Sequence, residues 1–173
     1  MRSLFSFIFV VSVLLSTSLF ATEYYIVLHH SGVNIRTGPD FSRVIIGEAS
    51  KSELYHYRGE EGDFYEIQMF TDEPRYISKS FTSKLAEPQL VSGHRMHLPE
   101  SEAVIGDMYE RITKAKERAR RESEEIIPSA LDAEKNKAYQ TILEDRYILQ
   151  VFRNREVQPA LYHELMEHGS AYE

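Results

Sequence analysis

Short β-like segments fill the chain between residues 24 and 85. They are rich in β-branched and aromatic residues and are separated by clusters of turn-forming residues, a pattern typical of a small all-β domain. A turn is nearly forced at Gly38-Pro39, because the proline ring fixes its own φ and keeps the glycine out of the helical region. Residues 59–63 read as a loop. The predicted strands are 24–28, 33–36, 44–47, 54–57, 64–69 and 75–77.

Residues 88–100 interrupt the pattern with two prolines and a glycine and have no sustained period, so we predict a linker there. Beyond it the apolar residues recur at intervals of three and four, which predicts a helix that Pro128 ends. The apolar positions of this first helix are Val104, Ile105, Met108, Tyr109, Ile112, Ala115 and Ala119.

A second helix is predicted at about 130–153, with Ser129 and Asp132 interpreted as a capping box at its start. Its apolar surface is wider than one antiparallel partner needs, so we expect it to contact two neighbours. The second neighbour could be the β half, the third helix or another subunit. That third helix, residues 159–169, has proline at its start and glycine at its end. The wide surface comprises Leu131, Ala138, Tyr139, Ile142, Leu143, Tyr147, Leu149, Val151 and Phe152.

The predicted strand 64–69 separates core from candidate surface, because side chains alternate faces along a strand. Its all-apolar set should face the core, and Phe64 should then stand on the outer face among polar neighbours. The alternative is that Phe64 packs under a neighbouring loop. The core set is Tyr65, Ile67 and Met69, and the outer set is Phe64, Glu66 and Gln68.

Three segments carry a family resemblance. Residues 33–39 (VNIRTGP), followed by 44–47 (VIIG), resemble the opening of bacterial SH3 (SH3b) domains. Residues 62–67 (GDFYEI) look like the family's Gly-Asp-Trp-Tyr-x-Val strand, and 76–81 (YISKSF) are similar to its closing aromatic strand and turn. The chain departs from the family at Phe64, where Trp is usual, at Ser52, where a turn glycine is common, and at Pro74-Arg75, where a glycine usually precedes the aromatic.

The resemblance implies a binding module, often directed at cell-wall peptides or protein partners, with Phe64 at the position of the groove aromatic. Arg36 and Asp40 flank the Gly38-Pro39 turn, where they could hold a charged ligand group or form a solvated loop pair. An acidic loop (Glu60, Glu61, Asp63) could recruit a cationic peptide or be a solvated hairpin tip. The candidate ligand-binding residues are Phe64, Tyr55, Tyr76, Arg36 and Asp40.

The predicted fold is therefore a mainly β N-terminal half, a small SH3-like barrel of residues 22–87, followed by a linker at 88–100 and an α-helical region of about three helices at 101–173. We expect the barrel to fold without the helices, because its signature ends by residue 85.

The first 21 residues have the pattern of a secretory signal peptide: a basic start, an apolar run at 4–15 and a small residue at Ala21. Cleavage is predicted after Ala21, or alternatively after Ser18, with an uncleaved N-terminal anchor as the other possibility. This predicts a periplasmic or secreted protein with no later membrane span. The chain contains no cysteine, which excludes disulfides, a lipid-bearing cysteine and a thiol nucleophile.

Acidic residues outnumber basic ones, with 27 Asp+Glu against 20 Lys+Arg and a formal net charge of −7. Neither half has the strongly basic footprint expected of a nucleic-acid-binding domain. The basic run 114–121 could meet a phosphate-bearing lipid, but acidic residues follow it at once, so we favour a solvated face with salt bridges.

The sequence contains neither a nucleophile elbow nor a phosphate-binding glycine loop nor a dinucleotide fingerprint, and its histidines do not have metal-site spacing. His163 and His168 are five residues apart, which does not match the i, i+4 pair of a zincin helix; His29 and His30 are adjacent, and His94 and His97 lie in the linker. We predict no catalytic residue, no metal and no cofactor. The favoured function is an exported cell-envelope binding or adaptor protein that recognises a peptide, either cell-wall-derived (peptidoglycan) or part of an envelope protein. The alternative is a structural, non-enzymatic protein that forms a homo-oligomer through its helices.

Overall fold

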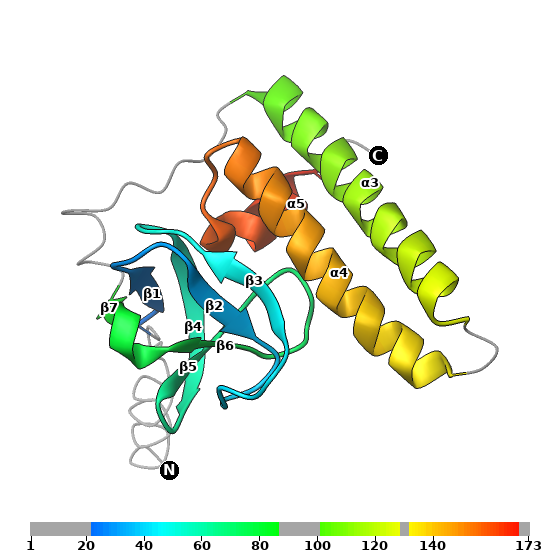
Figure 1. Ribbon diagram of the computed structural model, residues 1–173. Coiled ribbons are helices and arrows are strands. Elements are labelled where there is room, and N and C mark those ends of the chain that lie inside the picture. Colours follow the sequence, from blue (N-terminus) through cyan, green and yellow to red (C-terminus); the bar gives the residue numbers. More distant parts are fainter. Residues whose placement is uncertain (1–21, 87–100, 129–131, 170–173) are drawn as a thin grey trace, which may run out of the picture.

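The computed structural model describes residues 22–86, 101–128 and 132–169. The predicted division into a mainly β N-terminal half and a helical C-terminal half with three α-helices is confirmed (Figure 1). The strands are β1 (Tyr24–Leu28), β2 (Val33–Arg36), β3 (Ile45–Ala49), β4 (Leu54–Glu61), β5 (Phe64–Ile67), β6 (Arg75–Ser78) and β7 (Thr82–Ala86), with a 3₁₀ turn η1 (Lys79–Phe81) before β7. The helices are α3 (Glu102–Ile126), α4 (Ala133–Asn154) and α5 (Tyr162–Gly169), with a 3₁₀ turn η2 (Pro159–Leu161) before α5.

The strands form one seven-stranded antiparallel sheet in the order β3-β2-β6-β5-β4-β1-β7. Strands β3 and β7 stand at its two ends, and within the described residues no ladder joins them. The predicted closure into a barrel is thus not part of the observed strand pairing, and we describe this half as a sheet.

The largest differences from the sequence prediction are the extent of β4 and the presence of β7; β5 also ends at Ile67, two residues earlier than predicted. β4 continues to Glu61, so much of the predicted loop 59–63 belongs to a strand; only Gly62, with a φ of +53°, and Asp63 turn the chain into β5. β7 was not predicted as a separate strand. It pairs with β1 along its whole length and is only partly buried, so its sequence lacks the apolar alternation of the inner strands.

The helix ends follow local capping. The Ser101 side chain accepts a hydrogen bond from the Val104 amide, and α3 ends just before Pro128 as predicted. The cap of α4 is Asp132, whose carboxylate accepts from the Lys135 amide at 3.0 Å; Ser129, the other member of the predicted capping box, lies outside the described residues. Asp132 therefore acts as the cap itself.

α3 and α4 form an antiparallel pair on one side of the sheet, with α4 nearer the strands (Figure 1). The prediction that the second helix contacts two neighbours is confirmed, because α4 contacts both α3 and β3. One core cluster runs continuously through strands and helices. Its members include Ile26, Ile35, Ile67 and Ile77 from the strands and Met108, Ile112, Ile148, Leu149 and Phe152 from the helices.

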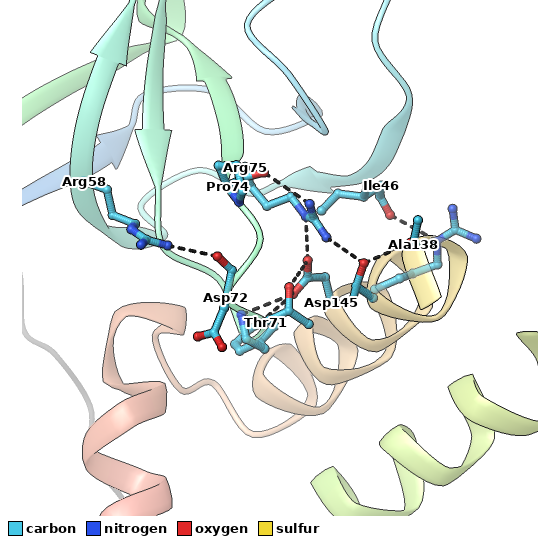
Figure 2. Close-up of polar contacts among 11 residues, drawn as sticks. Ile46, Arg58, Thr71, Asp72, Pro74, Arg75, Ala138 and Asp145 are labelled. Atoms are coloured by element: carbon cyan, nitrogen blue, oxygen red, sulfur yellow. Dashed lines mark hydrogen bonds and ion pairs between the residues drawn. The ribbon is translucent and has the colours of Figure 1, made fainter. Parts of the chain in front are cut away.

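Between β5 and β6, the chain reaches over to the helices. The Phe70 ring lies 5.1 Å from both the Phe152 and the Tyr162 rings, centroid to centroid. Next to it, Asp145 of α4 is ion-paired with Arg75 at 2.6 Å in a fully buried setting (Figure 2). The sheet and the helices thus share one core, which removes the basis for expecting the β half to fold alone.

Candidate functional site

Strand β5 presents different residues to its two faces. Ile67 is fully buried in the core cluster, Met69 joins the same cluster, and Tyr65 packs against it, as predicted. Phe64 belongs to neither core cluster of the described residues. It is nevertheless only 3% exposed, so the expectation of a solvent-facing aromatic is wrong. The Phe41 ring, 5.0 Å away, covers it from the β2–β3 loop.

A pocket of about 450 Å³ adjoins Phe64, and we call it the Phe64 pocket. Its walls come from the β1–β2 turn, β2, the β2–β3 loop, the start of β5, the end of β6 and η1. Strand register brings two of these elements together, since Phe64 pairs directly with Ser78. The lining residues are His30, Ser31, Gly32, Val33, Asn34, Arg36, Phe41, Phe64, Ser78 and Phe81.

The aromatic walls of the pocket are largely open to solvent. Phe41 is 66% exposed and Phe81 is 44% exposed. The His30 ring meets Phe81 edge-on at a centroid distance of 5.9 Å. Three phenylalanine rings and one imidazole therefore line a single pocket, an arrangement that can hold an apolar group between rings.

Arg36 provides the charge of the pocket. It is 9% exposed, and its Nη1 donates to the carbonyl oxygens of Phe41 at 2.8 Å and Arg43 at 3.0 Å. Its guanidinium carbon also lies 5.8 Å from the centre of the Phe41 ring. These contacts hold the β2–β3 loop, and with it Phe41, against β2.

Asp40 is exposed and does not line the pocket. Its carboxylate accepts a hydrogen bond from the Ser42 amide at 2.6 Å, and this bond is the main reason that its pKa lies below the ordinary value. The charges of Arg43 and Arg36 lower that pKa further, as smaller contributions. Asp40 thus shapes the loop and lies outside the Phe64 pocket.

The two candidate tyrosines also lie away from the pocket. Tyr55 is fully buried in the core, its hydroxyl donates to Glu53 at 2.7 Å, and burial raises its pKa well above the ordinary value. Tyr76 is 8% exposed and pairs across the sheet with Arg36 on one side and Glu66 on the other; burial raises its pKa too. Tyr55 is therefore a core residue, and Tyr76 does not line the pocket.

Of the candidate residues, the structure brings together Phe64 and Arg36, and it adds Phe41, Phe81 and His30, which the sequence analysis did not select. These three sit in turns, where no periodicity marks a face. A chemical signal was available for Phe41, because a large apolar side chain in a polar turn has no local structural role and therefore indicates a contact with another part of the chain or with a ligand.

The acidic loop and the basic stretch of α3 each contain charges that are paired within the chain. Glu60 pairs with Lys79 at 3.0 Å, and on α3 Lys114 pairs with Glu110 and Arg120 with Glu124. These exposed pairs support the interpretation of residues 114–121 as a solvated face.

Histidine does not assemble a metal centre in the described part of the chain. His163 contacts Gln68 at 2.5 Å, whereas His94 and His97 lie outside the described residues, as does the side chain of His168. Within residues 22–86, 101–128 and 132–169, no three His, Cys, Asp or Glu side chains converge as metal ligands would. None of the helices described there is long and apolar enough to cross a membrane.

Comparison with known proteins adds no relative: no family model, no curated protein and no solved structure matches this chain. The resemblance to bacterial SH3 domains accordingly stays a prediction.

Proposed function

We propose that this chain is an exported cell-envelope binding or adaptor protein whose β half binds a peptide in the Phe64 pocket. The observation that carries the proposal is the pair of exposed rings, Phe41 and Phe81, on one pocket. Exposed aromatic side chains clustered around a hollow are typical of binding surfaces, since they bury much apolar area on contact at low entropic cost. A volume of about 450 Å³ also falls within the usual range of ligand sites.

Two sequence features support the envelope as the place of action. The SH3b resemblance of residues 33–81 implies modules that bind wall peptides or protein partners. The signal-like pattern of residues 1–21 supports export; those residues lie outside the described part of the chain. Mass spectrometry of the envelope fraction tests cleavage, with a new N-terminus at Thr22 expected; an intact Met1 in the membrane fraction would instead support an uncleaved anchor, and recovery of the chain from the cytoplasm alone would contradict export.

Binding is tested by co-sedimentation of the purified chain with peptidoglycan sacculi. We expect Phe41→Ala and Phe81→Ala each to weaken binding at least about tenfold while the thermal transition stays in place. Matched controls are Val104→Ala and Ile126→Ala, which remove exposed apolar side chains from α3, a helix that contributes no residue to the pocket. Equal binding by all four variants would refute the site.

The alternative, a structural protein that oligomerises through its helices, was motivated by the wide apolar surface of the second helix. In the structure α4 uses this surface within the chain, against α3 and the sheet. We therefore propose a monomeric binding module. Light scattering should give the mass of one chain, and a stable oligomer would favour the alternative.

A further inference from the structure

Arg36 brings a positive charge into the wall of the Phe64 pocket, and no carboxylate of the described residues is ion-paired with it, although its charge is felt at Asp40. Only 9% of the residue is exposed, and it forms no ion pair with any described carboxylate. Its only side-chain hydrogen bonds there are the two from Nη1 to the carbonyl oxygens of Phe41 and Arg43. Neutral carbonyls stabilise a guanidinium, but they do not cancel its charge.

A buried charge is costly unless it is paired, and a guanidinium has five N–H donors. Two carbonyls occupy Nη1, which leaves the N–H groups of Nε and Nη2 with no hydrogen bond to a described residue. The N–H groups of Nε and Nη2 point outward along one edge of the planar guanidinium. Such an edge matches the two oxygens of a carboxylate, which it binds through two parallel hydrogen bonds.

Neighbouring acidic residues are engaged elsewhere or stand apart from Arg36. The Asp40 carboxylate is held by the Ser42 amide, and Glu60 is paired with Lys79. Glu48 comes near Gly32 on the pocket wall but forms no ion pair with Arg36. The guanidinium is therefore available to an acid supplied by another molecule.

We infer that the Phe64 pocket binds a carboxylate-bearing peptide, with Arg36 donating to the carboxylate and Phe41 and Phe81 holding the adjacent apolar part of the peptide. This inference rests on the proposed function and names the chemistry of its ligand. A C-terminal carboxylate and an acidic side chain share that chemistry, and the experiment separates them.

The test uses soluble peptides released from purified sacculi, with their amines acetylated. One portion is then amidated at its carboxyl groups with methylamine and a carbodiimide, so that the two portions differ only at those groups, where a neutral methylamide replaces the carboxylate. Titration calorimetry with the purified full chain should show at least a tenfold weaker affinity for the amidated portion. Synthetic versions of the bound peptide, with either a C-terminal amide or Gln in place of Glu, then identify which carboxylate is bound.

Variants locate the effect. Because Arg36 also holds Phe41 in place, Arg36→Gln is expected to weaken binding of both portions, and the decisive readout is the ratio of the two affinities. The preference for native over amidated peptides should fall at least tenfold in Arg36→Gln and be partly recovered in Arg36→Lys, which keeps the charge but not the two parallel donors. Arg43→Gln is the matched control: it removes an exposed arginine of the same loop that does not line the pocket. Circular dichroism checks folding, and if Arg36→Gln unfolds, the comparison of native with amidated peptides on the unaltered chain decides.

The outcomes are distinct. Strong binding of native and weak binding of amidated peptides supports the inference. Equal binding of both overturns it and leaves the proposed function standing. If neither portion binds, the proposed function fails, and the inference fails with it.

Discussion

The carboxylate of Asp145, in the middle of α4, accepts a hydrogen bond from Arg75 Nε at 2.6 Å, and both side chains are almost completely shielded from water (Figure 2). The same carboxylate accepts from the backbone amides of Phe70 and Thr71 at 3.2 and 3.1 Å. Burial raises the pKa of Asp145, while Arg75, Thr71 and the Phe70 amide oppose the rise. One helical side chain thus fastens both the β5–β6 loop and the start of β6 to the helices.

We predict that Asp145→Asn destabilises the protein by about 3–5 kcal/mol, because it leaves the Arg75 guanidinium buried without its counter-charge. Urea unfolding followed by circular dichroism measures the change. Glu110→Gln, which breaks a fully exposed pair with Lys114, is the control and should leave the midpoint where it is. Replacing both buried partners by Leu should cost less than Asp145→Asn; an equal or greater loss would contradict the argument.

A fragment of residues 22–86 should not melt cooperatively. Without the helices, the core face of its sheet loses Ile148, Leu149 and Phe152, and the ion pairs of Arg75 and Glu53 lose their partners on α4. We expect a broad thermal transition and binding of a hydrophobic dye, with the full chain as reference. A sharp transition close to that of the full chain would mean that the sheet has a self-sufficient core.

Periodicity placed most of this fold, because the elements are amphipathic and their apolar residues face one core. Ile67 was assigned to that core from alternation alone, and Pro128 and Asp132 mark helix ends by local chemistry that needs no tertiary information. The role of Asp145 could not be predicted in this way, because it depends on a tertiary contact with Arg75, 70 positions away in the sequence. An acidic residue on a helix looks solvent-facing in a sequence until its buried partner is known.

The candidate site shows the same limit. Alternation placed Phe64 on the face opposite Ile67, but its exposure depends on whether a loop covers it, and the ring that does so belongs to Phe41. Pocket walls built from turns carry no period that a sequence can reveal. The sequence singles out Arg36 because it stands beside a forced turn, and in the structure it lines the pocket.

Ile67→Ala should destabilise the protein by about 2–5 kcal/mol through lost burial and a cavity in the core. Since Phe64 is also buried, Phe64→Ala should cost about 3 kcal/mol, at the lower end for a phenylalanine because the pocket beside it is open to water. Thermal melts of both variants check this. A Phe64→Ala protein as stable as the unaltered chain would show that the Phe41 cover contributes nothing.

Stability should fall as the pH drops below neutrality, and His56 is one cause. Burial lowers the pKa of His56 from its ordinary 6.5, against smaller opposing effects of Glu23 and the Ala160 backbone. The unfolded chain therefore binds more protons at this site, so its contribution is constant above about pH 7 and is lost as the pH falls through 6.5 towards the lowered value. Denaturation at pH 7 and pH 5 should show a smaller difference for His56→Gln than for the unaltered chain. An NMR titration that places the His56 pKa at or above 6.5 would contradict this.

Ser52→Gly should stabilise the protein. Ser52 lies in the turn before β4 with a φ of +69°, a left-handed conformation that costs a residue with a side chain about 1–2 kcal/mol. Its amide hydrogen bond to the Leu28 carbonyl, at 3.0 Å, keeps the backbone in place and survives the substitution. The greater entropy of glycine in the unfolded chain costs about 0.5–1 kcal/mol and opposes the relief of strain, so the net gain in stability is up to about 1 kcal/mol.

Lys51→Gly is the matched control, because Lys51 is an exposed neighbour without a positive φ and the same substitution there brings only the entropic loss. The two melting temperatures should move in opposite directions, and a fall in both would show that the turn does not strain Ser52.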